Sequence, residues 1–115
     1  MLRDRMIEFS DTKEKEWEEL KSKVGEGIEL PLPDSERWFL ATSDGENIIV
    51  QSAVRNVRPL MVHDPIKITF QDFARVAEHY NMLFEPGVGG LDKKLELQRS
   101  VVNLRYIFVL IYNLL

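Results

Sequence analysis

The sequence contains no cysteine among its 115 residues and only two histidines, His63 and His79. The missing thiols exclude disulfide bonds, thiolate metal sites and cysteine nucleophiles. The most apolar stretch, residues 106–115, is about half as long as the roughly 20 residues that a membrane-spanning helix needs. The charged N-terminal segment does not resemble a signal peptide. We therefore expect a soluble, cytoplasmic protein with no membrane contact.

Patterns typical of catalysis or metal binding are equally scarce. His79 directly follows Glu78, and adjacent residues on a helix point about 100° apart. No serine lies in a Gly-x-Ser-x-Gly frame, and the glycines of residues 87–90 lack the Lys-Ser/Thr end of a phosphate loop. We predict no catalytic residue, no metal site and no cofactor, and we favour a protein that is not an enzyme.

Composition and charge are those of an ordinary globular domain, with 44% hydrophobic and 30% charged residues. We expect residues 1–115 to form one domain. The net charge of −4 is uneven, because residues 1–36 carry six basic and eleven acidic residues, or −5, whereas residues 37–70 carry four and three, or +1. A general electrostatic attraction to nucleic acid is therefore not expected.

An amphipathic helix is predicted over about residues 12–24. Asp11 is a suitable N-cap with Glu14 three residues later, and Gly25 stands where the helix would end. Its apolar residues form a narrow stripe on an otherwise charged helix, namely Trp17, Leu20 and Val24.

The clearest β pattern is a hairpin over residues 37–54, turning at Asp44-Gly45, a pair typical of two-residue turns. That turn would place Thr42 opposite Asn47 and Leu40 opposite Ile49. Both faces of the hairpin carry large apolar residues, so we expect both to be covered at least in part. A further strand is expected near residues 65–68, whereas residues 25–36 fit either an edge strand or a crossing loop.

Two more helices are predicted, over about residues 70–84 and 100–115. The first begins at Thr69, with Asp72 three residues later, and the second at Ser100. Residues 91–99 fit either an edge strand or the first turns of the last helix. The uncharged residues 106–115 should be buried, against the rest of the chain or a second copy.

Together these elements predict an α+β fold. A small antiparallel sheet is built around the 37–54 hairpin, with the 70–84 and 100–115 helices packed on one face. The amphipathic helix of residues 12–24 completes the domain.

The aromatic content favours association as the function. Two tryptophans, three tyrosines and six phenylalanines are a large load for one small domain, and interfaces are rich in such residues. We expect a protein-interaction or homo-oligomeric regulatory module, whose candidate interaction surface is Trp38, Phe39, Tyr106 and Tyr112.

The alternative is a nucleic-acid-associated regulator that contacts phosphates through the 55–67 region. Basic and amide side chains gather there and suit phosphate or base contacts. The candidate contact residues are Arg55, Asn56, Arg58 and Lys67. The sequence does not identify a partner or an oligomeric state, and it does not show whether the chain is a fragment of a longer protein.

Overall fold

The computed structural model describes residues 7–32, 35–81 and 103–115 and shows the predicted α+β fold. One four-stranded sheet has the order β1-β2-β3-β4, and each neighbouring pair is antiparallel. Ser100, residues 82–84 and the 91–99 segment lie outside the described residues. In chain order the elements are α1 (Glu14–Val24), β1 (Ile28–Pro31), β2 (Trp38–Ser43), β3 (Ile48–Ser52), β4 (Ile66–Ile68), α2 (Phe70–His79) and α4 (Leu104–Leu114).

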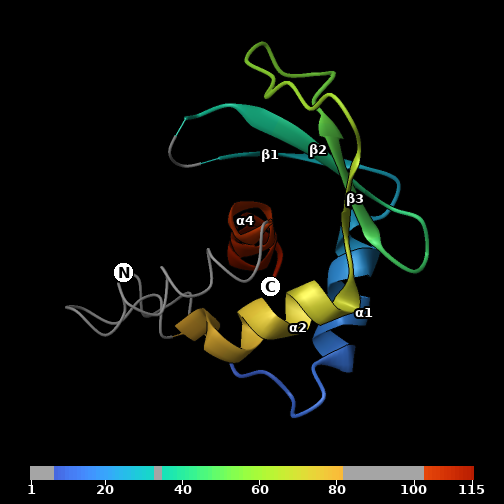
Figure 1. The fold of residues 1–115 in the computed structure, drawn as a ribbon, viewed down its shortest axis with the longest axis vertical. Helices are drawn as coiled ribbons and strands as arrows, with labels where there is room; N and C mark the ends of the chain where they lie inside the picture. Colours follow the sequence, from blue (N-terminus) through green and yellow to red (C-terminus); the bar gives the residue numbers. More distant parts are fainter. Residues whose placement is uncertain (1–6, 33–34, 82–102) are drawn as a thin grey trace, which may run out of the picture.

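The described helices α1, α2 and α4 lie on one side of the sheet, with α4 in the middle (Figure 1). Side chains alternate between the two faces of a strand, and the face toward α4 is the buried one. Its fully or nearly fully buried residues come from all four strands and are Leu30, Phe39, Ala41, Ile48, Val50 and Ile68. On the hairpin, Trp38, Leu40, Ile49 and Gln51 form the opposite face and are partly exposed.

Helix α4 is buried on most of its circumference, as its apolar sequence predicts. Six of its eleven residues are buried, and Tyr106 packs edge-on against Phe39 at a ring-centroid distance of 5.2 Å. At the other end, Lys23 Nζ donates to the Leu114 carbonyl oxygen at 2.6 Å, where the helix dipole favours a cation. Residues 106–111 thus dock within the chain, with Phe108 partly exposed. The last four residues are less buried than predicted, because residues 112, 114 and 115 are partly exposed and Asn113 is exposed. No helix in the described part of the chain combines the length and hydropathy of a membrane span.

Helix α1 presents the predicted stripe of Trp17, Leu20 and Val24 to the core, but its N-terminus is organised differently from the prediction. Asp11 does not cap the helix. Instead the buried Glu16 accepts hydrogen bonds from the Ser10 backbone N–H at 2.9 Å and from the Ser10 hydroxyl at 2.6 Å. Burial raises the pKa of Glu16, but these hydrogen bonds, the hydrogen bond from the Glu16 N–H and the charge of Lys15 together lower the pKa by more, so the ion is stabilised.

Helix α2 begins as predicted, because Thr69 Oγ1 accepts a hydrogen bond from the Asp72 N–H at 3.3 Å. Its buried face meets α1 through aromatic rings, and the Trp17 and Phe73 centroids lie 5.2 Å apart. The two helices therefore close the core on the side of α4 that faces away from the sheet.

The predicted hairpin register is wrong by two residues. Thr42 pairs with Ile49, and Leu40 pairs with Gln51, so the loop spans residues 44–47. The cause is the Asp44 side chain, whose Oδ1 accepts the Glu46 and Asn47 N–H groups at 2.9 and 2.7 Å. Only Gly45 then needs a positive φ, of 98°. A shift of two residues leaves every side chain on its original face, which is why the core prediction survives.

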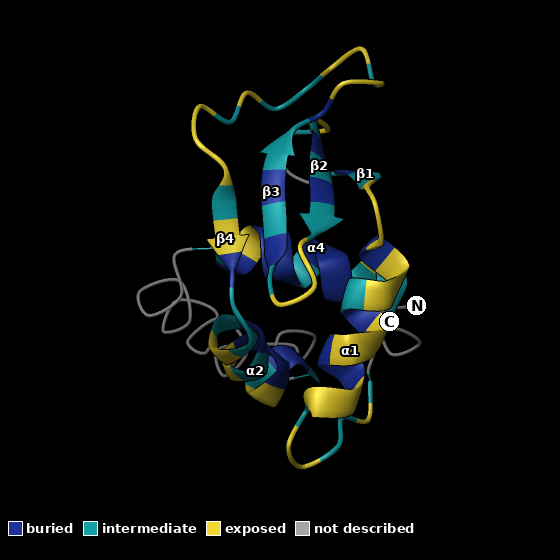
Figure 2. Cartoon of the chain, turned by 90° about the vertical axis from the view of Figure 1, so that its right-hand side faces the viewer, coloured by how far each residue is buried: buried dark blue, intermediate teal, exposed yellow. Residues whose placement is uncertain are grey.

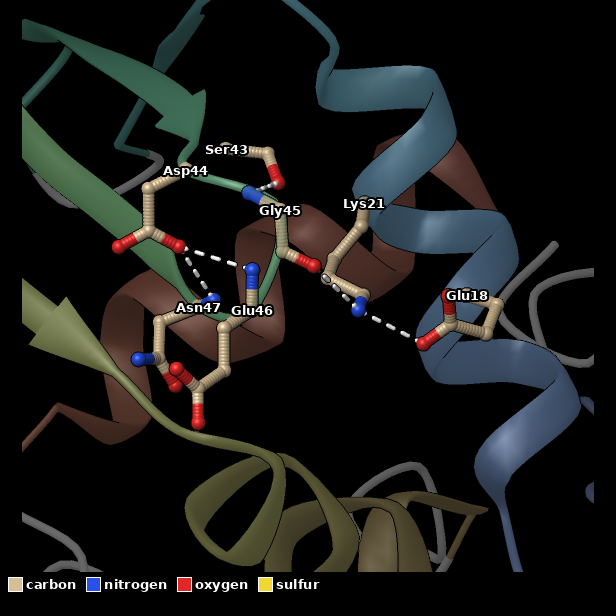
Figure 3. A network of polar contacts seen from close by, with 7 residues as sticks. All are labelled: Glu18, Lys21, Ser43, Asp44, Gly45, Glu46 and Asn47. Carbon is tan, nitrogen blue, oxygen red and sulfur yellow. Dashed lines mark hydrogen bonds and ion pairs between the residues drawn. The ribbon is translucent and has the colours of Figure 1, made fainter.

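Lys21 fastens this hairpin loop to α1 (Figure 3). Its side chain is 11% exposed, and its ammonium group donates to the Gly45 carbonyl oxygen at 3.0 Å and pairs with Glu18 at 2.7 Å. The Ser43 N–H also donates to the Gly25 carbonyl oxygen at 3.1 Å. One end of the hairpin is thereby fixed on the helical layer.

The outer face of the sheet is covered in part, as we expected, but less completely than the inner face. In Figure 2 no described helix lies over this face. Its central residues, among them Trp38, Leu40 and Ile49, are all partly exposed. Its edges discourage pairing with another strand, because Pro31 lacks an N–H and the short β4 carries an exposed Lys67.

The two faces of β2 predict unequal costs of truncation. Phe39→Ala should lower the free energy of unfolding by about 3–5 kcal/mol because it opens a cavity in the core. Leu40→Ala, on the outer face, should cost only about 1 kcal/mol. Urea unfolding of both variants checks this. Equal costs would mean that the outer face is covered in solution.

Candidate functional site

The strongest surface feature is the β3–β4 loop, residues 53–65. The exposed large hydrophobic residues of the described chain are all in this loop: Val54 is 78% exposed, Val57 96% and Met61 67%. Single exposed apolar side chains are common and need no explanation. Three of them on one connection define a candidate contact surface, which we call the loop surface: Val54, Val57 and Met61.

The loop is ordered although its tip projects from the sheet. Leu60 and Val62 are partly buried and pack against the hydrophobic core, so Met61 between them points outward. The Trp38 N–H donates to the Arg58 carbonyl oxygen at 2.9 Å, and the Leu60 N–H donates to the Trp38 carbonyl oxygen at 2.7 Å. The loop thus extends the sheet by one parallel bridge beside the start of β2.

Ser52 holds the returning arm of the loop. Its hydroxyl oxygen accepts the Val62 N–H at 2.7 Å, and the hydroxyl donates to the Val62 carbonyl oxygen at 3.3 Å. The Ser52 hydroxyl thus makes both of the hydrogen bonds to Val62 that a neighbouring strand's backbone would otherwise make. The last residue of β3 therefore fixes the segment that leads into β4.

Glu29, on β1, holds the outgoing arm. Its Oε2 accepts the backbone N–H groups of Val54 and Arg55, each at 2.9 Å. Its Oε1 accepts the backbone N–H of Asn56 at 3.2 Å and the Asn56 side-chain amide at 2.5 Å. Three consecutive backbone N–H groups that converge on one anion form a nest, a common anion-binding arrangement. Here the anion is a carboxylate of the same chain.

The environment of this carboxylate favours its charged form. Desolvation raises the pKa of Glu29, whereas the hydrogen bonds from the Asn56 side chain and from the N–H groups of Val54, Arg55 and Asn56 lower the pKa by more. The Glu29 pKa therefore lies below its ordinary value of 4.5. At neutral pH the loop is held by an ionised side chain.

The sequence-predicted aromatic surface does not form one patch. Phe39 and Tyr106 are 0% and 4% exposed and pack against each other in the core. Trp38 is partly exposed on the outer face of the sheet. Tyr112 is partly exposed on α4, on the other side of the sheet, where it stacks on Phe108 at 5.8 Å. Only Trp38 adjoins the loop surface, through its backbone.

The structure does not bring the predicted nucleic-acid contacts together. Arg55, Asn56 and Arg58 lie in the loop, whereas Lys67 lies on β4, where its charge acts on Asp44 of the hairpin loop. Arg55 and Lys67 are exposed. The Asn56 amide is already bonded to Glu29, and Arg58 lies 3.5 Å from Glu36 in an exposed pair, which is a weak interaction.

Neither histidine of the described residues belongs to a metal-binding group. Within 7–32, 35–81 and 103–115 no three His, Asp or Glu side chains are grouped closely enough to hold a metal ion. His63 is exposed, and His79 lies 4.0 Å from Glu78. Sequence reasoning missed the loop surface, although apolar residues alternating with arginines between residues 54 and 58 were an available signal.

No family model matches the chain, and no significant match exists among the curated proteins or the solved structures.

Three carboxylates predict how stability depends on pH. Glu16, Glu29 and Asp44 all have lowered pKa values, and for Asp44 the leading cause is the hydrogen bonds from the Asn47 and Glu46 N–H groups. Their contribution is complete above the unfolded pKa values, 4.5 for Glu and 3.8 for Asp. It is lost as the pH falls through the lower folded values.

We therefore expect the urea midpoint to be constant between about pH 7 and pH 5 and to fall below about pH 4.5. Glu29→Gln should be less stable than the wild type at neutral pH and should lose less on acidification. A wild-type midpoint that rises below pH 4.5 would contradict this assignment.

Proposed function

We propose that this chain is a protein-interaction module whose β3–β4 loop binds a partner protein through an apolar contact with an acidic rim. The observation that carries the proposal is the loop surface itself. Its three exposed hydrophobic residues, Val54, Val57 and Met61, are held on a backbone fixed by Glu29, Trp38 and Ser52.

A fixed loop favours binding because less conformational entropy is lost when the partner arrives. The apolar side chains supply desolvated contacts at the centre of an interface, where most binding free energy is concentrated. The neighbouring outer face of the sheet adds partly exposed apolar area at Trp38, Leu40 and Ile49. Exposed apolar side chains add nothing to the stability of the isolated chain, and they contribute free energy only when a partner removes them from water.

Charge indicates the chemistry of the partner. Arg55 and Arg58 alternate with Val54 and Val57, and Asp64 is the one acidic residue of the loop. With histidine neutral, residues 53–65 carry two positive charges and one negative, or +1. Acidic side chains around the partner's apolar contact would complement the arginines and speed association.

The same charges argue against a second copy of the chain as the occupant. A two-fold symmetric contact places the same patch against itself. Centred on this loop, it would bring the arginines of both copies together. We therefore place a different, acidic protein segment on the loop surface.

Nucleic acid fits the loop less well. Phosphate binding generally needs many cationic contacts. The loop offers Arg55 and Arg58, of which Arg58 is already beside Glu36, and Lys67 lies on β4, where its charge acts on Asp44. The binding experiment below includes DNA, so that it also tests the nucleic-acid alternative.

The test uses peptides selected from a random 12-residue display library on the wild-type chain. The selected peptides should be rich in Asp and Glu around apolar residues. Val57→Asp should weaken their binding at least about tenfold, because it removes an apolar contact and repels the acidic rim. Ser22→Asp, at an exposed position of α1, adds the same charge elsewhere and should leave binding unchanged.

Peptides that bind Val57→Asp as tightly as the wild type would overturn the proposal. Light scattering at micromolar concentration should show a monomer, and a dimer abolished by Val57→Asp would assign the surface to a second copy instead. Binding to random DNA that falls steeply with salt and is lost in Arg55→Glu would favour the nucleic-acid alternative.

A further inference from the structure

We infer that Glu29 is the positioning residue of the loop surface: its carboxylate sets the outgoing arm, residues 54–57, in the conformation that presents Val54 and Val57. The binding role of that arm rests on the proposed function. The effect of Glu29 on loop order does not, and it is measured in the free protein.

The two oxygens of the Glu29 carboxylate can accept all four N–H donors that surround them. Val54 N and Arg55 N share Oε2, while Asn56 N and Asn56 Nδ2 share Oε1. Two donors on each oxygen require both oxygens to be acceptors. A glutamine has one acceptor oxygen, so its NH₂ group would face two N–H donors and leave them unpaired.

The two arms of the loop make hydrogen bonds with different groups: the outgoing arm is residues 54–57 and the returning arm is residues 58–62. Trp38 bonds to Arg58 and Leu60, and Ser52 bonds to Val62, so these contacts fix the returning arm and with it Met61. In the described structure, the hydrogen bonds of residues 54–56 all lead to Glu29. The two arms are therefore held by different groups.

Packing against the core does not hold the outgoing arm in place of its hydrogen bonds to Glu29. Val54, Arg55 and Val57 are exposed, whereas the returning arm packs Leu60 and Val62 against the core. An exposed loop segment with few apolar contacts opens at little cost unless hydrogen bonds hold it. The order of the outgoing arm consequently depends on a side chain that is 25 residues away from Val54 in sequence.

The experiment measures backbone ¹⁵N order parameters in the wild type, Glu29→Gln and Glu26→Gln. Glu26 is an exposed residue three positions earlier, so its variant removes the same charge without touching the loop. In Glu29→Gln the order parameters of residues 54–57 should fall from about 0.85 to below about 0.6. Those of Leu60 and Val62 should not change, and Glu26→Gln should resemble the wild type.

Ser52→Ala provides the reciprocal test, because it should loosen residue 62 and leave residues 54–56 ordered. Glu29→Asp, shorter by one methylene, should behave like Glu29→Gln. Unchanged order at residues 54–57 in both Glu29 variants, with the fold intact by circular dichroism, would overturn the inference.

Peptide binding separates this inference from the proposed function. Peptides whose binding needs Val57 should bind Glu29→Gln at least about fivefold more weakly than the wild type, because residues 54–57 must then become ordered on binding. If the Glu29 variants loosen the arm but no peptide depends on Val57, the proposed function fails and the positioning role stands. If Val57-dependent peptides bind and the arm stays ordered without the Glu29 carboxylate, the positioning role fails alone.

Discussion

The architecture depends on the burial of α4. A helix that is apolar on most of its circumference needs apolar neighbours on several sides, and the sheet, α1 and α2 supply them (Figure 1). Each of these elements has one main apolar face, and that face is used against α4 or against its neighbours. The Phe39–Tyr106 contact joins the sheet to this helix. As a result, the helices gather on one side and the outer face of the sheet stays partly exposed.

This arrangement places the β3–β4 loop away from the helical layer. The hairpin loop at residues 44–47 lies at the other end of β3, where Lys21 binds it to α1. Figure 2 shows the β3–β4 connection projecting beyond the sheet at the opposite end. Antiparallel neighbours need only a short connection, and a 13-residue one without regular structure is typical of functional loops. The fold therefore leaves free the segment that carries the exposed apolar residues.

Sequence periodicity predicted the elements because it records which side of each element is buried. The alternation in residues 38–50 identified the faces of the hairpin, and the Thr69 cap identified the start of α2. The register and the α1 N-terminus were wrong because a single side chain decided each: Asp44 lengthened the loop, and Glu16 turned back to Ser10. Such choices depend on local hydrogen bonds that compete with the regular pattern.

The candidate site was harder to predict than the fold. Counting aromatic residues pointed to an interface, but Phe39 and Tyr106 fill the core, since composition does not distinguish buried rings from exposed ones. The sequence did not predict that residues 54–57 are ordered, and the reason is different. Their order comes from a contact between β1 and a loop that lies two strands further along the chain, and no short motif records that contact.

Among the residues that the structure describes, Asp44 and Glu29 each accept consecutive backbone N–H groups. Comparing them explains why Glu29 suggests a function and Asp44 does not. Asp44 binds the N–H groups two and three residues ahead, which closes a turn with polar side chains. Glu29 orders a segment that buries almost nothing and displays Val54 and Val57. Ordering a backbone costs entropy that burial normally offsets. Where burial is missing inside the chain, contact with another protein is the interaction that would supply it.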